Sequence, residues 1–192
     1  SDVFECNEKG KEKPLFEYAR PFRGNIFPEL LKLNFINTQT VVIRRDAFGS
    51  LNNPFDASLI IAGDYDAYLR ISYKWKIDYI NKPLARYRVH RNSKTWKDGR
   101  KLLTVELGLI IENLKQVDCE IEEKFPVGIR ALKRFRDVQL SLVDWENGDK
   151  KMARERLRIY VCDSIVYLIL YFLVYFPYRY VYYPCYLVRT KG

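Results

Sequence analysis

The spacing of hydrophobic residues changes twice along the chain. Up to about Ser93, short apolar runs alternate with short helical patterns and turn signals such as Asn52-Asn53-Pro54. The β-branched run TVVI predicts a buried strand from Thr40 to Ile43. Another strand is predicted from Asp2 to Cys6, and NEKGK after it predicts a turn. The first part of the chain is therefore expected to mix strands and helices.

One helix is predicted inside this mixed region. Apolar residues recur at helical spacing between Tyr65 and Trp75, at positions Tyr65, Tyr68, Leu69 and Tyr73. These positions fall on one face of an α-helix.

After Ser93 the pattern becomes wholly helical. Spacings of four and three alternate through Leu103, Leu107, Ile110, Leu114 and Val117. They predict an amphipathic helix over Lys101 to Val117. A second helix is expected over Gly128 to Trp145. A third begins near Asp149, because ENGDK carries a glycine and acidic residues typical of a helix end and a helix start.

The composition shifts again from Tyr160, where nine of the fifteen tyrosines lie. The apolar run IVYLILYFLVYF, Ile165 to Phe176, has twelve residues, whereas a helix needs about 20 to cross a bilayer. Three interpretations stay open: a buried core helix, a helix in the membrane interface, or a span extended back through Asp163. In the second, the basic residues of the tail, Arg179, Arg189 and Lys191, would meet acidic headgroups.

The net charge limits the classes of binding partner, and the cysteine content indicates the cellular compartment. The net charge of +9 favours an anionic partner, but Lys and Arg are scattered among acids, which argues against nucleic acid. The four cysteines form no CxxC pair, so free thiols in a reducing compartment are expected. This favours a cytoplasmic protein, with the inner face of the cell membrane as the place where a peripheral protein would bind.

A row of cations is predicted in the segment Lys82 to Ser93. If Leu84 to His90 is a strand, period two puts Ala85, Tyr87 and Val89 on one face and Arg86, Arg88 and His90 on the other. The row is either charge protection of an edge strand or the wall of a binding site.

Two aspartates in AGDYDAYLR are open to two interpretations. Asp64 is a favoured N-cap type, and Asp66 with Arg70 makes an i, i+4 ion pair. Alternatively, an aspartate at a helix N-terminus can act as a general base toward a hydroxyl.

The order of motifs resembles the C-terminal half of family 2 glycosyltransferases, which are inverting enzymes of the GT-A fold. The likeness is carried by NFINTQTVVIRRDAF (Asn34 to Phe48), NPFDASL (Asn53 to Leu59), GDYDAYLR (Gly63 to Arg70) and IDYINKPLARYRVHRNS (Ile77 to Ser93). In order and spacing these are similar to the family's strand before the acceptor site, its FDE turn, its ED motif and its YRxH segment.

The resemblance implies roles for particular residues. Asp64 matches the base that deprotonates the acceptor hydroxyl, although Gly63 replaces the glutamate before it. His90 matches a histidine that can complete the coordination of a divalent metal, Mg or Mn. Arg88, and by the strand argument Arg86, would face the diphosphate of a nucleotide-sugar donor. The acceptor would be a saccharide or a lipid-linked saccharide.

The resemblance also implies a domain organisation. Residues 1–95 are expected to form the acceptor-side portion of a Rossmann-like GT-A domain, and residues 96–192 a helical extension. For the aromatic C-terminus of this extension, the membrane interface is one of the three interpretations that stay open. The only DxD spelling is Asp64-Tyr65-Asp66, at the ED position. The nucleotide-binding half and the metal-binding DxD are therefore expected upstream of Ser1, and the chain alone is expected to be inactive. The alternative is a non-catalytic, membrane-associated helical interaction module in which Asp64 is only a cap.

Overall fold

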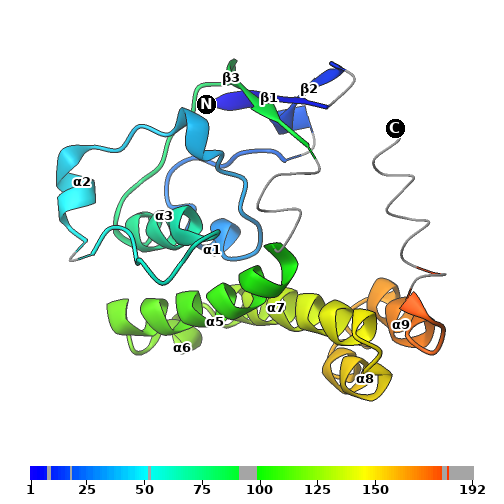
Figure 1. The fold of residues 1–192 in the computed structure, drawn as a ribbon. Coiled ribbons are helices and arrows are strands. Elements are labelled where there is room, and N and C mark those ends of the chain that lie inside the picture. Colours follow the sequence, from blue (N-terminus) through cyan, green and yellow to red (C-terminus); the bar gives the residue numbers. More distant parts are fainter. Residues whose placement is uncertain (8–9, 18, 52, 91–98, 179–180, 182–192) are drawn as a thin grey trace. The chain divides into compact units, whose positions relative to one another are not determined.

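The computed structural model describes residues 1–7, 10–17, 19–51, 53–90, 99–178 and 181 (Figure 1). The elements are, in chain order, β1 (Asp2–Cys6), β2 (Glu12–Pro14), η1 (Leu15–Glu17), α1 (Phe27–Leu30), η2 (Thr38–Thr40), α2 (Arg45–Gly49), α3 (Gly63–Lys74), β3 (Pro83–Arg88), α5 (Gly99–Val117), α6 (Ile121–Lys124), α7 (Pro126–Glu146), α8 (Lys150–Arg158) and α9 (Ile165–Leu173). The fold is mixed α/β. Its two compact units are Ser1–Leu132 and Lys133–Gly192.

The boundary between these units differs from the expected division at residue 95. α5, α6 and the first turns of α7 belong to the first unit, with β1 to β3 and α1 to α3. The reason is packing, since the apolar faces of α3 and α5 share one hydrophobic core.

The small sheet of the first unit has the order β2-β1-β3. β1 confirms the predicted strand and pairs antiparallel with β2 across the predicted turn, where Gly10 has a φ of 77°. β3 runs parallel to β1, with Val3 opposite Ala85 and Cys6 opposite Arg88. Within the described residues, β3 pairs with no second strand, and its side chains alternate between half-buried and exposed.

The core of the first unit lies around α3 and α5. Both helices are confirmed close to their predicted bounds. Leu69 on α3 and Leu107, Ile110 and Leu114 on α5 are fully buried, as the periodicity predicts. Each fully buried side chain of this size stabilises the fold by about 1.5–3 kcal/mol.

The second unit is built on the C-terminal part of α7 with α8 and α9. As predicted, α7 ends at a glycine, Gly148, whose φ is 90°, and α8 is capped by Asp149, whose side chain accepts a hydrogen bond from the Met152 N–H at 2.9 Å. A smaller core forms around Trp145, which donates from Nε1 to the Phe176 carbonyl at 2.8 Å.

The strand predicted at Thr40 to Ile43 is wrong. The Asn37 side chain accepts from the Gln39 N–H and starts the 3-10 turn η2, which ends at Thr40. Beyond it Val41 and Ile43 pack against the core while Val42 is 97% exposed, and no strand of the described chain pairs with this segment. Val41 and Ile43 face the core and Val42 faces solvent because one side of this segment packs on the core, and the segment does not join a sheet of the described residues.

Cys6, Cys119 and Cys162 are free thiols, as expected; Cys185 lies outside the described residues. No helix of the described chain combines the length and the apolar character needed to cross a bilayer.

Asp118, which follows α5, gives the first unit a pH-dependent contact. Hydrogen bonds from Lys124, from the Tyr73 hydroxyl and from the Glu120 N–H lower the pKa of Asp118 to about 2, from an ordinary value of 3.8. Because this pKa is lowered in the folded state, the stabilisation is present above about pH 4 and is lost as the pH falls toward about 2.

We therefore expect the free energy of unfolding to fall with pH across this window, and to fall less steeply in an Asp118→Asn variant. Urea unfolding followed by tryptophan fluorescence between pH 2 and 5 measures both slopes. Asp46→Asn, at an exposed aspartate of α2, is the control for the loss of one surface carboxylate. An unchanged slope in Asp118→Asn would contradict the assignment.

Candidate functional site

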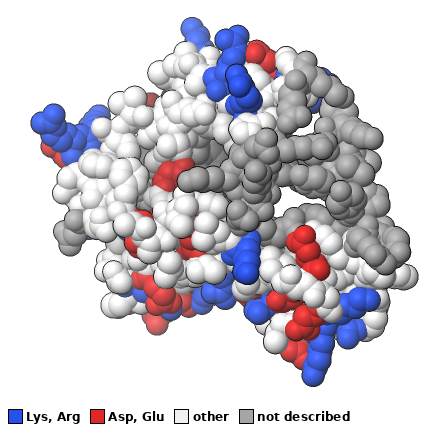
Figure 2. Space-filling view, viewed as in Figure 1, with Lys and Arg blue, Asp and Glu red and all other residues white. Residues whose placement is uncertain are grey.

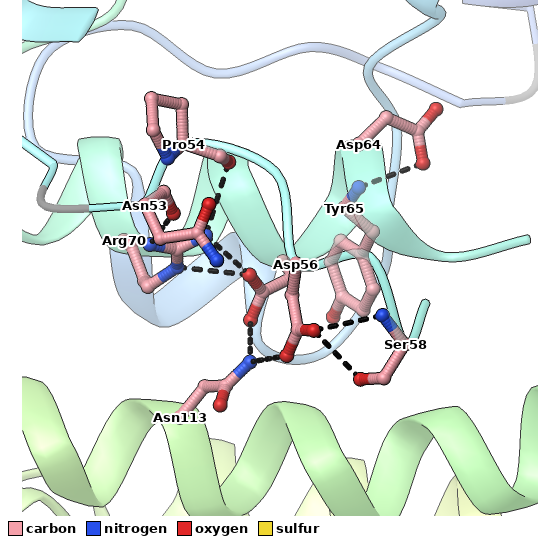
Figure 3. A network of polar contacts seen from close by, with 9 residues as sticks. Asn53, Pro54, Asp56, Ser58, Asp64, Tyr65, Arg70 and Asn113 are labelled. Carbon is pink, nitrogen blue, oxygen red and sulfur yellow. Dashed lines mark hydrogen bonds and ion pairs between the residues drawn. The ribbon is translucent and has the colours of Figure 1, made fainter. Parts of the chain in front are cut away.

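Asp64 lies in the first turn of α3 and is not its cap. The N-cap is Ala62, which offers no side-chain hydrogen bond. The Asp64 carboxylate accepts from the Tyr65 N–H at 2.7 Å and from the Thr38 hydroxyl. Figure 3 shows it at the start of the helix, pointing away from the network around Arg70. The capping role expected for Asp64 is therefore wrong, because the helix begins at Gly63, two residues before the start at Tyr65 that this role requires.

A buried glutamate on α5, Glu106, accepts hydrogen bonds at the N-terminus of α3, as the side chain of an N-cap residue usually does. The Glu106 side chain is fully buried and accepts from the backbone N–H groups of Ile60, Ile61 and Ala62 at 2.6 to 3.1 Å. These N–H groups immediately precede α3, where a negative charge is also favoured by the helix dipole. Glu106 thus fixes the loop from which Asp64 projects.

Asp66 is a structural residue. Its carboxylate is fully buried and pairs with Arg70, whose Nη2 lies 2.6 Å from Oδ2 (Figure 3). Arg70 also donates to the carbonyls of Asn53 and Pro54 at 2.8 and 3.0 Å, while Asn113 of α5 donates to Asp66 at 3.2 Å. The predicted pair is confirmed, but its burial makes it part of the core and not a surface contact.

The three residues of the predicted cationic row come together on one surface pocket of about 900 Å³. Arg86, Arg88 and His90 line it with Tyr87, Cys6, Asn7, Gly10, Glu12 and Gln39. Figure 2 shows Lys and Arg side chains gathered over β1 and β3 at the top of the view. The row is therefore a real surface feature of the β3 segment. We name this pocket, with its row of cations, the basic pocket.

Within the basic pocket, Arg86 forms an ion pair with Glu12. Its Nε donates to Glu12 at 2.8 Å, and the Cys6 thiol donates to the same oxygen at 3.3 Å. These two hydrogen bonds lower the pKa of Glu12. Arg86 therefore has a carboxylate partner, which leaves Arg88 as the stronger candidate for an anionic ligand.

The described residues do not by themselves fit a divalent metal. No group of three or more His, Cys, Asp or Glu side chains among them could hold one. The charged residues that line the basic pocket with His90 are Arg86, Arg88 and a single carboxylate, Glu12. Mg²⁺ and Mn²⁺ prefer several oxygen ligands. The expected role of His90 as a metal ligand would need carboxylates in addition to these residues.

A second pocket, of about 660 Å³, is lined in large part by aromatic side chains. Phe16, Phe22, Phe35, Tyr68, Trp75 and Tyr79 contribute to its wall. Asn37, Thr40 and Asp78 add polar groups to it, and Arg44, Lys74 and Lys76 add cationic side chains. Aromatic side chains combined with polar groups are typical of pockets that bind small organic ligands. We call it the aromatic pocket.

The short turn η2 connects these features. Asn37 and Thr40 line the aromatic pocket, Gln39 lines the basic pocket, and Thr38 donates to Asp64. Thr38 is also a hydrogen-bond partner of Tyr68, whose pKa is raised mainly by burial. Asp64 is not among the residues that line the basic pocket. The turn η2 links the two, because Thr38 donates to Asp64 and Gln39 lines the basic pocket.

The sequence analysis missed Thr38, Gln39 and Glu106. The first two lie in a stretch, INTQT, whose polar residues interrupt any strand alternation. Glu106 lies three residues after Leu103 and four before Ile110, so it is an acid on the apolar face of α5. A carboxylate in such a position is the signal that could have found it, because a buried carboxylate needs donors.

Comparison of this chain with protein-family models, with curated proteins and with solved structures returned no match.

Proposed function

We propose that the chain takes part in inverting glycosyl transfer from a nucleotide sugar to a saccharide or lipid-linked acceptor. The observation that carries the proposal is the turn η2. Its three residues, with the N-cap Asn37 before them, border the aromatic pocket, border the basic pocket and hold the Asp64 carboxylate. A transferase needs these three parts close together: an acceptor site, an anion site and a base.

Asp64 is the proposed base. Its carboxylate is half-buried and is held by Tyr65 and Thr38 on a helix that Glu106 fixes in place. It would take the proton of the acceptor hydroxyl while that oxygen bonds to the anomeric carbon. The bond from this carbon to the diphosphate then breaks on the opposite face, which inverts the configuration.

Arg88 is the proposed contact for the departing diphosphate. A guanidinium suits this role because it forms paired, charge-assisted hydrogen bonds with phosphate oxygens. Arg86 would assist only by giving up part of its contact with Glu12. The basic pocket is thus the donor side of the proposal, and the aromatic pocket is its acceptor side.

Arg88→Gln tests the donor side in the full-length protein. We expect kcat/KM for the nucleotide sugar to fall by about 10- to 100-fold, because a hydrogen bond to a charged group contributes about 1.5–3 kcal/mol. Release of nucleoside diphosphate from a panel of nucleotide sugars measures the rate, and NMR of the product shows whether the anomeric configuration is inverted. Arg45→Gln, at an exposed arginine of α2 that lines neither pocket, is the control.

Two results would overturn this proposal. One is the absence of transfer with every donor in the panel. The other is a product that retains the donor's configuration, since a single base and direct attack cannot give retention.

A further inference from the structure

Helix α9 of the second unit, with Phe176 after it, carries a face of exposed apolar side chains. Ile165, Ile169, Phe172 and Phe176 follow each other at spacings of four, three and four, and with Val166 they are 52 to 66% exposed. None of the residues of α9 is buried. The interpretation of Ile165 to Phe176 as a buried core helix is therefore wrong.

The other side of α9 is also apolar and is already in use. Leu170 and Leu173 pack against the small core around Trp145, and Val174 at the end of the helix is fully buried in it. The helix is thus held in place by one face and presents the other to its surroundings. Large contiguous apolar patches on a protein surface mark sites of interaction with proteins or membranes.

Cations border this face. Five of the nine residues of α8 are Lys or Arg, against one glutamate, and α8 packs on α9. Lys150 donates to the Tyr175 carbonyl at 2.9 Å, and the Arg154 guanidinium lies 4.1 Å from the centre of the Tyr175 ring. Tyr175 is itself half exposed. The apolar face, a tyrosine and two cations therefore meet at the C-terminal end of α9.

This combination matches the chemistry of a membrane surface that contains acidic phospholipid. Apolar side chains enter the boundary of the acyl chains, tyrosine prefers the headgroup level, and Lys and Arg meet the phosphates. The nine residues of α9 measure about 14 Å along the axis, which is about half the thickness of the hydrocarbon core. The helix is thus suited to lie in the plane of the membrane and not to cross it.

We propose that α8 and α9 form a docking surface for membranes with acidic headgroups, with α9 lying in the interface. The apolar face of α9 supplies the depth of insertion, and the cations of α8 supply the preference for acidic lipid. The proposal does not rest on the catalytic one, because its measurement is lipid binding and needs no sugar donor.

Vesicle flotation of the 192-residue chain tests the docking surface. We expect the chain to float with vesicles of phosphatidylcholine and phosphatidylglycerol and to bind less to phosphatidylcholine alone. The double variant Ile169→Glu with Phe172→Glu should lower binding by about tenfold or more, because it removes two inserted apolar side chains. Val105→Glu with Val127→Glu is the matched control, as both valines are exposed apolar residues of the first unit.

A second pair of substitutions tests the charge contribution. Lys151→Gln with Arg154→Gln should lower binding to acidic vesicles by roughly tenfold or more while hardly changing binding to neutral ones. Circular dichroism confirms that each variant is folded.

The docking surface would be disproved if the wild-type chain stays off both kinds of vesicle, or if the α9 variant floats like the control. A third result also overturns it: wild-type dimers in analytical ultracentrifugation that the α9 variant converts to monomers, with no vesicle binding by either. In that case the face would be a contact between two copies of this chain.

Discussion

Replacing Asp64 by asparagine is expected to lower the rate of glycosyl transfer by about 10² to 10⁴-fold, the usual contribution of a general base. Asparagine keeps the size of the side chain and an oxygen that can accept from Tyr65 and Thr38. It cannot take a proton from an acceptor hydroxyl. The loss should therefore appear in kcat, with KM for the acceptor little changed.

The stability of the Asp64→Asn variant separates catalysis from structure. The substitution removes one charge from the first turn of α3, which costs about 0.3–1 kcal/mol. Asp46→Asn, in the first turn of α2, is the matched control and should keep full activity. Full activity in Asp64→Asn would disprove the assigned base.

Asp66→Ala is expected to have the opposite profile, with a loss of about 3–5 kcal/mol in the free energy of unfolding. The substitution leaves Arg70 without its carboxylate at a site where both side chains are withdrawn from water. Asn113 also loses its contact with Asp66, although it keeps its contact with Asp56. Urea unfolding at pH 7 measures the difference.

Two comparisons make the Asp66 result specific. Asp64→Ala, two residues away on the same helix, should lie within about 1 kcal/mol of the wild type. Asp66→Asn should fall between the two, because burial raises the pKa of Asp66 and so favours an uncharged group, while asparagine still offers Arg70 an oxygen. A loss of less than about 1 kcal/mol in Asp66→Ala would contradict the structural role.

The elements that could be predicted from the sequence are those whose side chains repeat with a clear period. α3, α5 and α7 follow their apolar stripes, and α8 follows its capping aspartate, Asp149. The TVVI run failed because strand propensity acts only where a neighbouring strand exists, and the described chain places none beside Val41 to Ile43. Local pattern carries no information on such a distant partner.

The candidate site was predicted in its parts and not in its assembly. Period two correctly placed Arg86 and Arg88 on the exposed side of β3. His90 lies beyond the end of the strand and lines the basic pocket together with Tyr87, which period two put on the other face. Residue spacing could not show that Glu12 of β2 would form an ion pair with Arg86 of β3. It also could not show that Asp66 would be buried while Asp64 is not. These outcomes depend on contacts between segments from 44 to 74 residues apart, such as Ala62 with Glu106 and Glu12 with Arg86.

The contact between Glu106 and the loop before α3 has a practical consequence for protein engineering. A hybrid that exchanges the helical part of this chain for another, joined at residue 95, would lose the carboxylate that holds Ile60, Ile61 and Ala62. The loop would then be free to move, and Asp64 with it. A join after Leu132, where the first compact unit ends, would carry Glu106 along. A hybrid that is to keep Asp64 in its present position must therefore also keep helix α5, whatever sequence follows that helix.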